Sequence, residues 1–102
     1  MKQIIAYIND HIQSKILGKD ILDALHISSN RFYDVMKQEK VTLPQLINSI
    51  RIKTAKELIA QEKGKSLSEI GFLSGFNESH HFFRIFKNVE GITPKEYRNK
   101  IQ

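Results

Sequence analysis

The stretch "GFNESHHFFRIFK", from Gly75 to Lys87, decides how this chain folds, because it interleaves phenylalanines with charged and imidazole side chains. At about 100° per residue, the large apolar residues of this stretch and its continuation fall on one face of a helix. These residues are Phe82, Ile85, Phe86 and Val89. Their clustering predicts a helix over residues 78–88 whose apolar face packs into the protein core.

The opposite face of the predicted helix is polar and carries His80, Arg84 and Lys87, with Phe83 on the flank. The stretch "ISSNRFYDVMK", Ile27 to Lys37, lies fifty residues earlier and repeats this arrangement. Its expected inward residues are Phe32, Val35 and Met36, its outward residues are Asn30, Asp34 and Lys37, and Tyr33 is on its flank. A repeated pair of short helix, turn and longer helix is typical of a double helix-turn-helix arrangement.

We predict an all-α fold, because apolar residues recur at helical spacing throughout and only two prolines interrupt the chain. Capping-box patterns mark helix starts after Thr42, Ser66 and Thr93. The seven expected helices span residues 3–14, 19–25, 29–38, 43–62, 67–74, 78–88 and 94–100. The expected organisation is a single domain over residues 1–102, with lobe 1 at 1–41, a linker helix at 43–62 and lobe 2 at 66–102.

Composition excludes several classes of protein. The chain has 102 residues, enough for one domain, and its lack of cysteine excludes disulfide frameworks and thiol catalysis. No catalytic or phosphate-loop motif occurs, so we expect no enzyme and no cofactor. We expect no metal site, because His80 and His81 diverge by about 100° on a helix and no cysteine accompanies them. Without a long apolar run, we expect no membrane partner and a cytoplasmic location.

The formal net charge of +5 suits a polyanionic partner such as nucleic acid. The charge is spread along the chain without a basic tail, so folding would have to assemble any basic surface. Two alternatives stay open: the polar faces could dock a partner protein, or they could bind nucleic acid without sequence preference. A steep salt dependence together with a sequence-specific footprint would exclude both alternatives.

The stretch "SLSEIGFLSGFNESHHFFRIFKNVEGITPKEYR" resembles the signature of AraC/XylS-type bacterial transcription regulators. The matching elements are Ile70 and Gly71, Gly75 and Phe76, Phe82, Arg84, Phe86 and Lys87, Gly91, Thr93 and Pro94, and Tyr97 and Arg98. Upstream, "INSIRIKTAKELI" resembles the linker helix of the family and "ISSNRFYDVMK" its first recognition helix. The resemblance covers essentially the whole chain and implies two homeodomain-like three-helix units that bind double-stranded promoter DNA.

The resemblance also implies which side chains touch DNA. The expected base contacts are Asn30, Arg31, Tyr33, Asp34, Ser79, His80, Phe83 and Arg84. The expected phosphate contacts are Ser28 and Asn77 at the two helix starts, Lys37, Lys87, Lys95 and Arg98. Arg84 can pair with guanine and Asn30 with adenine, each through two hydrogen bonds. Asp34 either accepts from cytosine N4 or pairs with Lys37 or Arg31 on its own helix.

The expected linker helix spans about 30 Å, close to the ~34 Å between successive major-groove faces of B-DNA. One monomer could therefore place two recognition helices in adjacent grooves. The resemblance further implies transcription activation through contact with RNA polymerase, and we expect the isolated domain to be a monomer. Leu22 and Val41 replace small residues of the family pattern, so we expect reshaped turns in the first unit.

Overall fold

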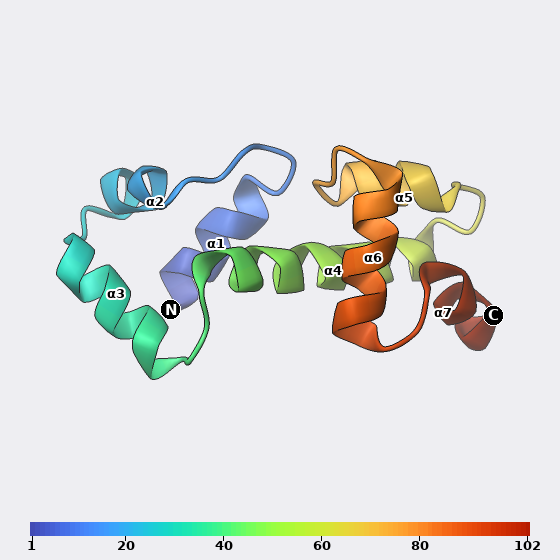
Figure 1. Ribbon diagram of the computed structural model, residues 1–102. Helices are drawn as coiled ribbons and strands as arrows, with labels where there is room; N and C mark the ends of the chain where they lie inside the picture. Colours follow the sequence, from blue (N-terminus) through green and yellow to red (C-terminus); the bar gives the residue numbers. More distant parts are fainter. The chain divides into compact units, whose positions relative to one another are not determined.

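Seven α-helices and no β-strand make up the computed structural model, which describes residues 1–102 (Figure 1). The helices are α1 (Lys2–Asp10), α2 (Gly18–Leu25), α3 (Ser29–Gln38), α4 (Leu43–Gln61), α5 (Leu67–Leu73), α6 (Ser79–Glu90) and α7 (Pro94–Ile101). None of them is long and apolar enough to cross a membrane. The all-α fold with seven helices is therefore confirmed.

Helix α1 ends earlier than expected, at Asp10 rather than at residue 14. The backbone N–H of His11 donates to the carbonyls of Tyr7 at 3.1 Å and Ile8 at 3.2 Å, which closes the last turn. The His11 ring also stacks on the Tyr7 ring, with centroids 4.1 Å apart. Helix α1 therefore ends at Asp10 with His11 as its C-cap, a boundary that apolar periodicity does not reveal.

The chain divides into two compact units, Met1–Ile50 and Arg51–Gln102, which we call lobe 1 and lobe 2 from here on. The buried core of lobe 1 consists of Ile4, Ile8, Ile21, Phe32, Met36, Ile47 and Ile50. The buried core of lobe 2 consists of Ile52, Ala55, Ile59, Ile70, Phe76, Phe82 and Phe86. The interpretation of residues 1–102 as a single domain stays a prediction.

Helix α4 contributes to both cores, so each half of the expected linker helix is part of a lobe. Its buried residues are Ile47 and Ile50 in the first half, and Ile52, Ala55 and Ile59 in the second half. At about 100° per residue these two sets fall on different faces of the helix, so α4 has no single apolar stripe. Its start is capped as predicted: the Thr42 N–H donates to Gln45 Oε1 at 3.0 Å, and the Gln45 N–H donates to Thr42 Oγ1 at 3.2 Å.

Glycine allows close packing and sharp turns in lobe 2. A Cβ added at Gly71 in α5 would lie 2.5 Å from Cδ2 of Phe82 in α6, so only glycine fits without a shift. The turn between these helices contains Gly75 with φ 105°, and α6 ends at Gly91 with φ 83°. Val89 was expected to point inward but is 46% exposed, because it lies in the last turn of α6, past the buried residues.

The turns of lobe 1 use left-handed backbone without glycine. His26, which ends α2, and Lys40, which follows α3, both have φ 54°. The Val41 N–H donates to the carbonyl of Met36 at 3.2 Å, and Val41 keeps a negative φ. Because a β-branched side chain disfavours the left-handed region most strongly, it is Lys40 rather than Val41 that takes the conformation of Gly91. This is the reshaped turn that the sequence led us to expect.

Candidate nucleic-acid interface

Helix α6 begins at Ser79, one residue later than expected, and is capped by Glu78. The Glu78 carboxylate accepts the N–H of His80 at 2.6 Å and the N–H of His81 at 3.0 Å. A carboxylate satisfies two free N–H groups at once and is favoured by the positive end of the helix dipole. The hydrogen bond from His80, followed by that from His81, lowers the pKa of Glu78. These amides are therefore already paired with an anion.

The two faces of α6 differ as predicted. Phe82 and Phe86 are fully buried, whereas His80, Arg84 and Lys87 are exposed. Because the exposed residues are four and three positions apart, they form one line along the helix. This line presents an imidazole, a guanidinium and an ammonium group to solvent, and the buried phenylalanines fix its direction relative to the core.

The other two predicted base contacts of α6 are half-buried. Ser79 Oγ donates to Ser68 Oγ of α5 at 3.0 Å, so this hydroxyl can offer a partner only its acceptor sites. Phe83 packs against the lobe 2 core, and its ring meets the His80 ring edge-on with centroids 6.5 Å apart. Phe83 therefore supports His80 and leaves part of its own ring accessible.

Helix α3 carries the corresponding surface of lobe 1. Ser28 caps it as predicted, since Ser28 Oγ accepts the N–H of Arg31 at 3.2 Å. The predicted contacts that are exposed here are Asn30, Arg31, Tyr33, Asp34 and Lys37. The Tyr33 side chain is 68% exposed and meets the Phe32 ring edge-on at 5.4 Å. Unlike α6, α3 presents a carboxylate among its cations.

No ion pair forms among the exposed side chains of α3 described above, or among those of α6. Lys56 Nζ of α4 forms a salt bridge with Glu90 Oε1 of α6 at 2.8 Å. Asp34 forms no ion pair with Lys37 or Arg31 on its own helix, which was one of its two expected roles. These exposed charges are therefore open to a partner. The structure contains no group of three or more His, Cys, Asp or Glu side chains that could hold a metal ion.

The six predicted phosphate contacts are not equally free. Ser28, Lys37, Asn77, Lys87 and Lys95 are exposed. Arg98 is half-buried, and its Nη2 donates to the carbonyl of Lys65 at 2.8 Å, while its Nε is buried without a partner. Arg98 thus links α7 to the segment before α5, and only part of its guanidinium group is available to phosphate.

Two residues that shape this surface were not identified from the sequence. Ser68 is eleven residues before Ser79, and no local pattern connects the two. Glu78 follows Asn77, which is the stronger capping residue by preference, so capping preference alone would place the cap one residue too early. The acidic residue directly before the helix was the signal that could have found the cap.

Two helix-turn-helix units, each exposing a polar second helix, define a DNA-binding domain of the kind found in transcription regulators. The family described as "Helix-turn-helix domain" matches residues 21–100. The chain belongs to the AraC-type helix-turn-helix family. The probable transcriptional regulator LumQ of Photobacterium leiognathi is 31% identical over 93 residues, which are 90% of this chain and 37% of LumQ.

Other relatives agree. The HTH-type transcriptional activator RhaS of Citrobacter koseri is 25% identical over 99 residues, which are 96% of this chain and 35% of RhaS. This chain thus spans about a third of the length of these curated relatives. All are described as transcription regulators, and no enzyme family is indicated.

Solved structures show the same fold. A crystal structure of an apo ToxT variant from Vibrio cholerae has a TM-score of 0.93 and 25% identity, and the match covers 99% of this chain and 37% of that one. A transcriptional regulator from Chromobacterium violaceum, described by its AraC-type DNA-binding domain, has a TM-score of 0.90 at 24% identity, covering 98% of this chain and 89% of that one. At this identity the second likeness concerns the fold alone.

Proposed function

We propose that this chain binds promoter DNA in a sequence-specific manner and regulates transcription, with α3 and α6 each reading a major groove. One observation carries the proposal: α3 and α6 each expose polar and charged side chains without internal ion pairs, opposite a buried apolar face. In helix-turn-helix proteins the second helix of the motif enters the major groove in this orientation.

The side chains suit particular bases. Arg84 can donate two hydrogen bonds to O6 and N7 of guanine, and Asn30 can exchange two with N6 and N7 of adenine. Exposed Asp34 can accept a hydrogen bond from cytosine N4, because it forms no ion pair within its own helix. Tyr33 and the accessible part of Phe83 can contact thymine methyl groups. His80, Arg31 and the acceptor sites of Ser79 would add further contacts at base edges.

Phosphate contacts would fix the register of the domain on DNA. Lys37, Lys87 and Lys95 serve as phosphate anchors in this proposal. The exposed side chain of Asn77 and the part of the Arg98 guanidinium group that does not bond to Lys65 would add to them. The start of α3, capped by the neutral hydroxyl of Ser28, attracts a phosphate. The start of α6 does not, because the Glu78 carboxylate already occupies its amides.

The two recognition helices would occupy adjacent grooves of one duplex, from a monomeric domain in the cytoplasm. The support is the length of α4, which has 19 residues, or about 29 Å at ~1.5 Å per residue. Activation, with RNA polymerase as the second partner, is proposed because the RhaS relatives are described as activators.

The test is selection of bound fragments from a random duplex library, carried out at two salt concentrations. The proposal expects an asymmetric motif of two blocks, about one helical turn (10–10.5 base pairs) apart. Affinity should fall steeply with salt, because each phosphate contact releases counterions. A single block would mean that lobe 1 positions the domain and reads no bases.

Two outcomes would reject the proposal in different ways. Binding that fades with salt without any enriched motif would indicate a nonspecific basic domain. No binding to DNA at either salt concentration would favour the alternative in which the line of His80, Arg84 and Lys87 docks a protein partner.

A further inference from the structure

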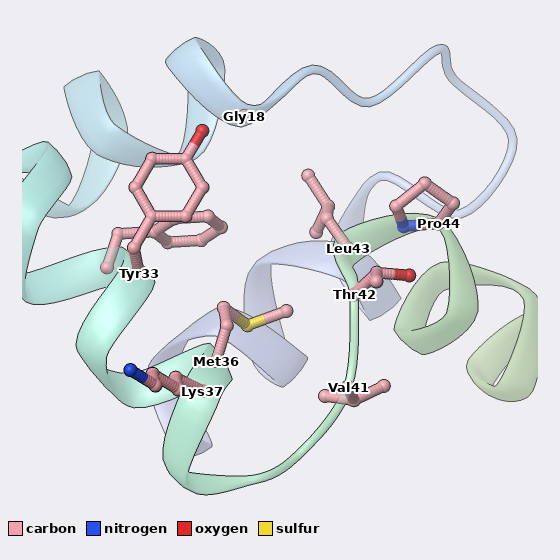
Figure 2. Close-up of a pocket in the computed structure, with 9 residues that line it drawn as sticks. Gly18, Tyr33, Met36, Lys37, Val41, Thr42, Leu43 and Pro44 are labelled. Carbon is pink, nitrogen blue, oxygen red and sulfur yellow. The ribbon is translucent and has the colours of Figure 1, made fainter.

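We propose that a hollow in lobe 1 is a binding site for a compact aromatic anion. The lobe 1 hollow has a volume of about 560 Å³ and lies between α3 and the start of α4 (Figure 2). It is lined by Gly18, Phe32, Tyr33, Met36, Lys37, Val41, Thr42, Leu43 and Pro44. This volume lies within the ~300–1,000 Å³ of typical small-molecule sites.

The walls of the lobe 1 hollow favour a flat apolar body. Figure 2 shows the Tyr33 ring and Met36 on one side, and Val41, Leu43 and Pro44 on the other. An aromatic body between these walls would meet the Tyr33 ring and the adaptable thioether of Met36, both of which pack well against aromatic groups. Phe32 and Met36 belong to the lobe 1 core, so this side of the hollow is rigidly placed.

The polar groups at the lobe 1 hollow favour a negative head group. Its only charged residue is Lys37, and no carboxylate lines it. Lys37 is exposed and makes no ion pair. In Figure 2 its stem borders the hollow while its ammonium group points away, and the flexible stem allows that group to turn to the mouth. The hydroxyls of Tyr33 and Thr42 can also donate hydrogen bonds to an anion.

A comparison of the two repeats explains why the hollow is larger in lobe 1. Lobe 2 has a corresponding, smaller hollow of about 350 Å³, lined by Leu67, Phe83, Thr93, Pro94 and Lys95. Leu67 is the first residue of α5, as Gly18 is the first residue of α2, and both line their hollows. A leucine occupies space in lobe 2 that the glycine leaves empty in lobe 1. The larger volume is therefore a property of lobe 1 and not of the repeated fold.

A ligand in the lobe 1 hollow would also affect DNA binding, a consequence that rests on the proposed function. Tyr33 and Lys37 line the hollow and are proposed DNA contacts on α3. An anion held by Lys37 would neutralise a phosphate anchor and restrict Tyr33. Ligand binding should therefore weaken contact with the DNA block read by lobe 1 and leave the block read by lobe 2 unchanged.

The experiment titrates 2-naphthalenesulfonate into the ¹⁵N-labelled protein without DNA and follows amide chemical shifts. We expect saturable shifts at residues 18, 33, 36–37 and 41–44. The neutral 2-naphthalenesulfonamide, of the same size, should bind about three- to fivefold more weakly, because it cannot pair with Lys37. Equal affinity of the two probes, or shifts centred outside these residues, would overturn the proposal.

Two variants test the residues. Gly18→Leu should raise the Kd for the probe by at least about tenfold, because the side chain fills the hollow as Leu67 does in lobe 2. The space exists for it: a Cβ at Gly18 lies 3.8 Å from Leu43 Cδ2, which is ordinary contact. Lys37→Gln should raise the Kd about three- to fivefold, and Lys87→Gln, its counterpart in lobe 2, should not change it.

These variants keep the two proposals separate. If Gly18→Leu lost the native amide spectrum, Lys37→Gln and the neutral probe would still decide the site. Unchanged probe affinity in a folded Gly18→Leu variant would overturn the hollow as the binding site. Probe binding that leaves DNA affinity unchanged would overturn the link to DNA but not the site, and failure of DNA binding alone would reject only the proposed function.

Discussion

Lobe 1 and lobe 2 form the same kind of helix pair, but they have different residues where helices pack closely and where the backbone is left-handed. In lobe 2, glycine allows α5 to touch α6 and supplies two left-handed residues. In lobe 1 the left-handed residues are His26 and Lys40, and each costs about 1–2 kcal/mol more than glycine would. The recognition helix is also shorter, with 10 residues in α3 against 12 in α6. The repeated fold thus tolerates the loss of its glycines, but at a cost in backbone strain.

The difference also concerns charge. At the place of Arg84 in α6, α3 has Asp34, and a neutral serine caps α3 where Glu78 caps α6. In lobe 2, α5 and α6 pack closely and the exposed charges of α6 are cationic. In lobe 1, the backbone is strained at two turns, α3 exposes both an acidic and basic side chains, and the hollow is larger. We infer that lobe 2 contributes most of the affinity for DNA and that lobe 1 modulates it.

The largest expected effect is on the packing of lobe 2. Gly71→Val should lower the free energy of unfolding of lobe 2 by about 3 kcal/mol, because Cβ would collide with the buried Phe82 ring. Urea unfolding followed by separate amide signals for each lobe measures this. Gly64→Ala is the matched control, since a Cβ there has nothing within 4 Å. Equal loss in both variants would show that close packing of α5 on α6 is not what requires glycine.

The next effect concerns DNA. Arg84→Ala should weaken binding by about 1–3 kcal/mol and relax the preference at one base pair, whereas Lys87→Ala should weaken all sequences alike. In lobe 1, Asp34→Ala should change affinity less, because the variant removes both a base acceptor and a charge that repels phosphate. Titrations with the selected site and with single-base variants of it measure all three. If Arg84→Ala and Lys87→Ala lost affinity equally on every sequence, Arg84 would not read a base.

A smaller effect has opposite signs in the two lobes. Gly91→Ala should destabilise lobe 2 by about 1 kcal/mol, because φ is 83° and the added Cβ meets no neighbour, so only backbone strain contributes. Lys40→Gly should stabilise lobe 1 by about 0.5–1 kcal/mol, because the greater freedom of glycine in the unfolded chain offsets part of the strain removed at φ 54°. Urea unfolding of each lobe measures both changes. The same sign in both variants would contradict the strain explanation.

The sequence predicted the fold well because apolar spacing, capping boxes and Gly91 are local signals. It also placed Phe82 and Phe86 in the core and His80 and Arg84 on the surface, since helical periodicity alone determines these faces. It missed features that depend on distant residues. The Ser68–Ser79 hydrogen bond, the contact of Arg98 with Lys65 and the lobe 1 hollow arise only when helices pack.

The smallest effect concerns pH and the start of each recognition helix. The pKa of Glu78 is lowered from its ordinary value of 4.5 because the carboxylate accepts the N–H groups of His80 and His81. A carboxyl with a lowered pKa stabilises the folded state fully above its ordinary value, and this contribution is lost as the pH falls through the lowered value. The start of α6 should therefore loosen below about pH 4.5, whereas the hydroxyl that caps α3 does not titrate in this range.

Amide hydrogen exchange at His80 and His81 between pH 5 and pH 3 measures this loss, because the Glu78 carboxylate accepts these two N–H groups. Exchange is compared with that of the unfolded peptide at each pH, so that the intrinsic pH dependence cancels. Protection in α6 should fall with pH in the native protein and stay constant in Glu78→Gln, which keeps a neutral acceptor at the cap. Ser28→Ala should reduce protection at the start of α3 by the same factor at every pH. A fall in α6 that persists in Glu78→Gln would show that the Glu78 carboxylate is not the source of the acid sensitivity.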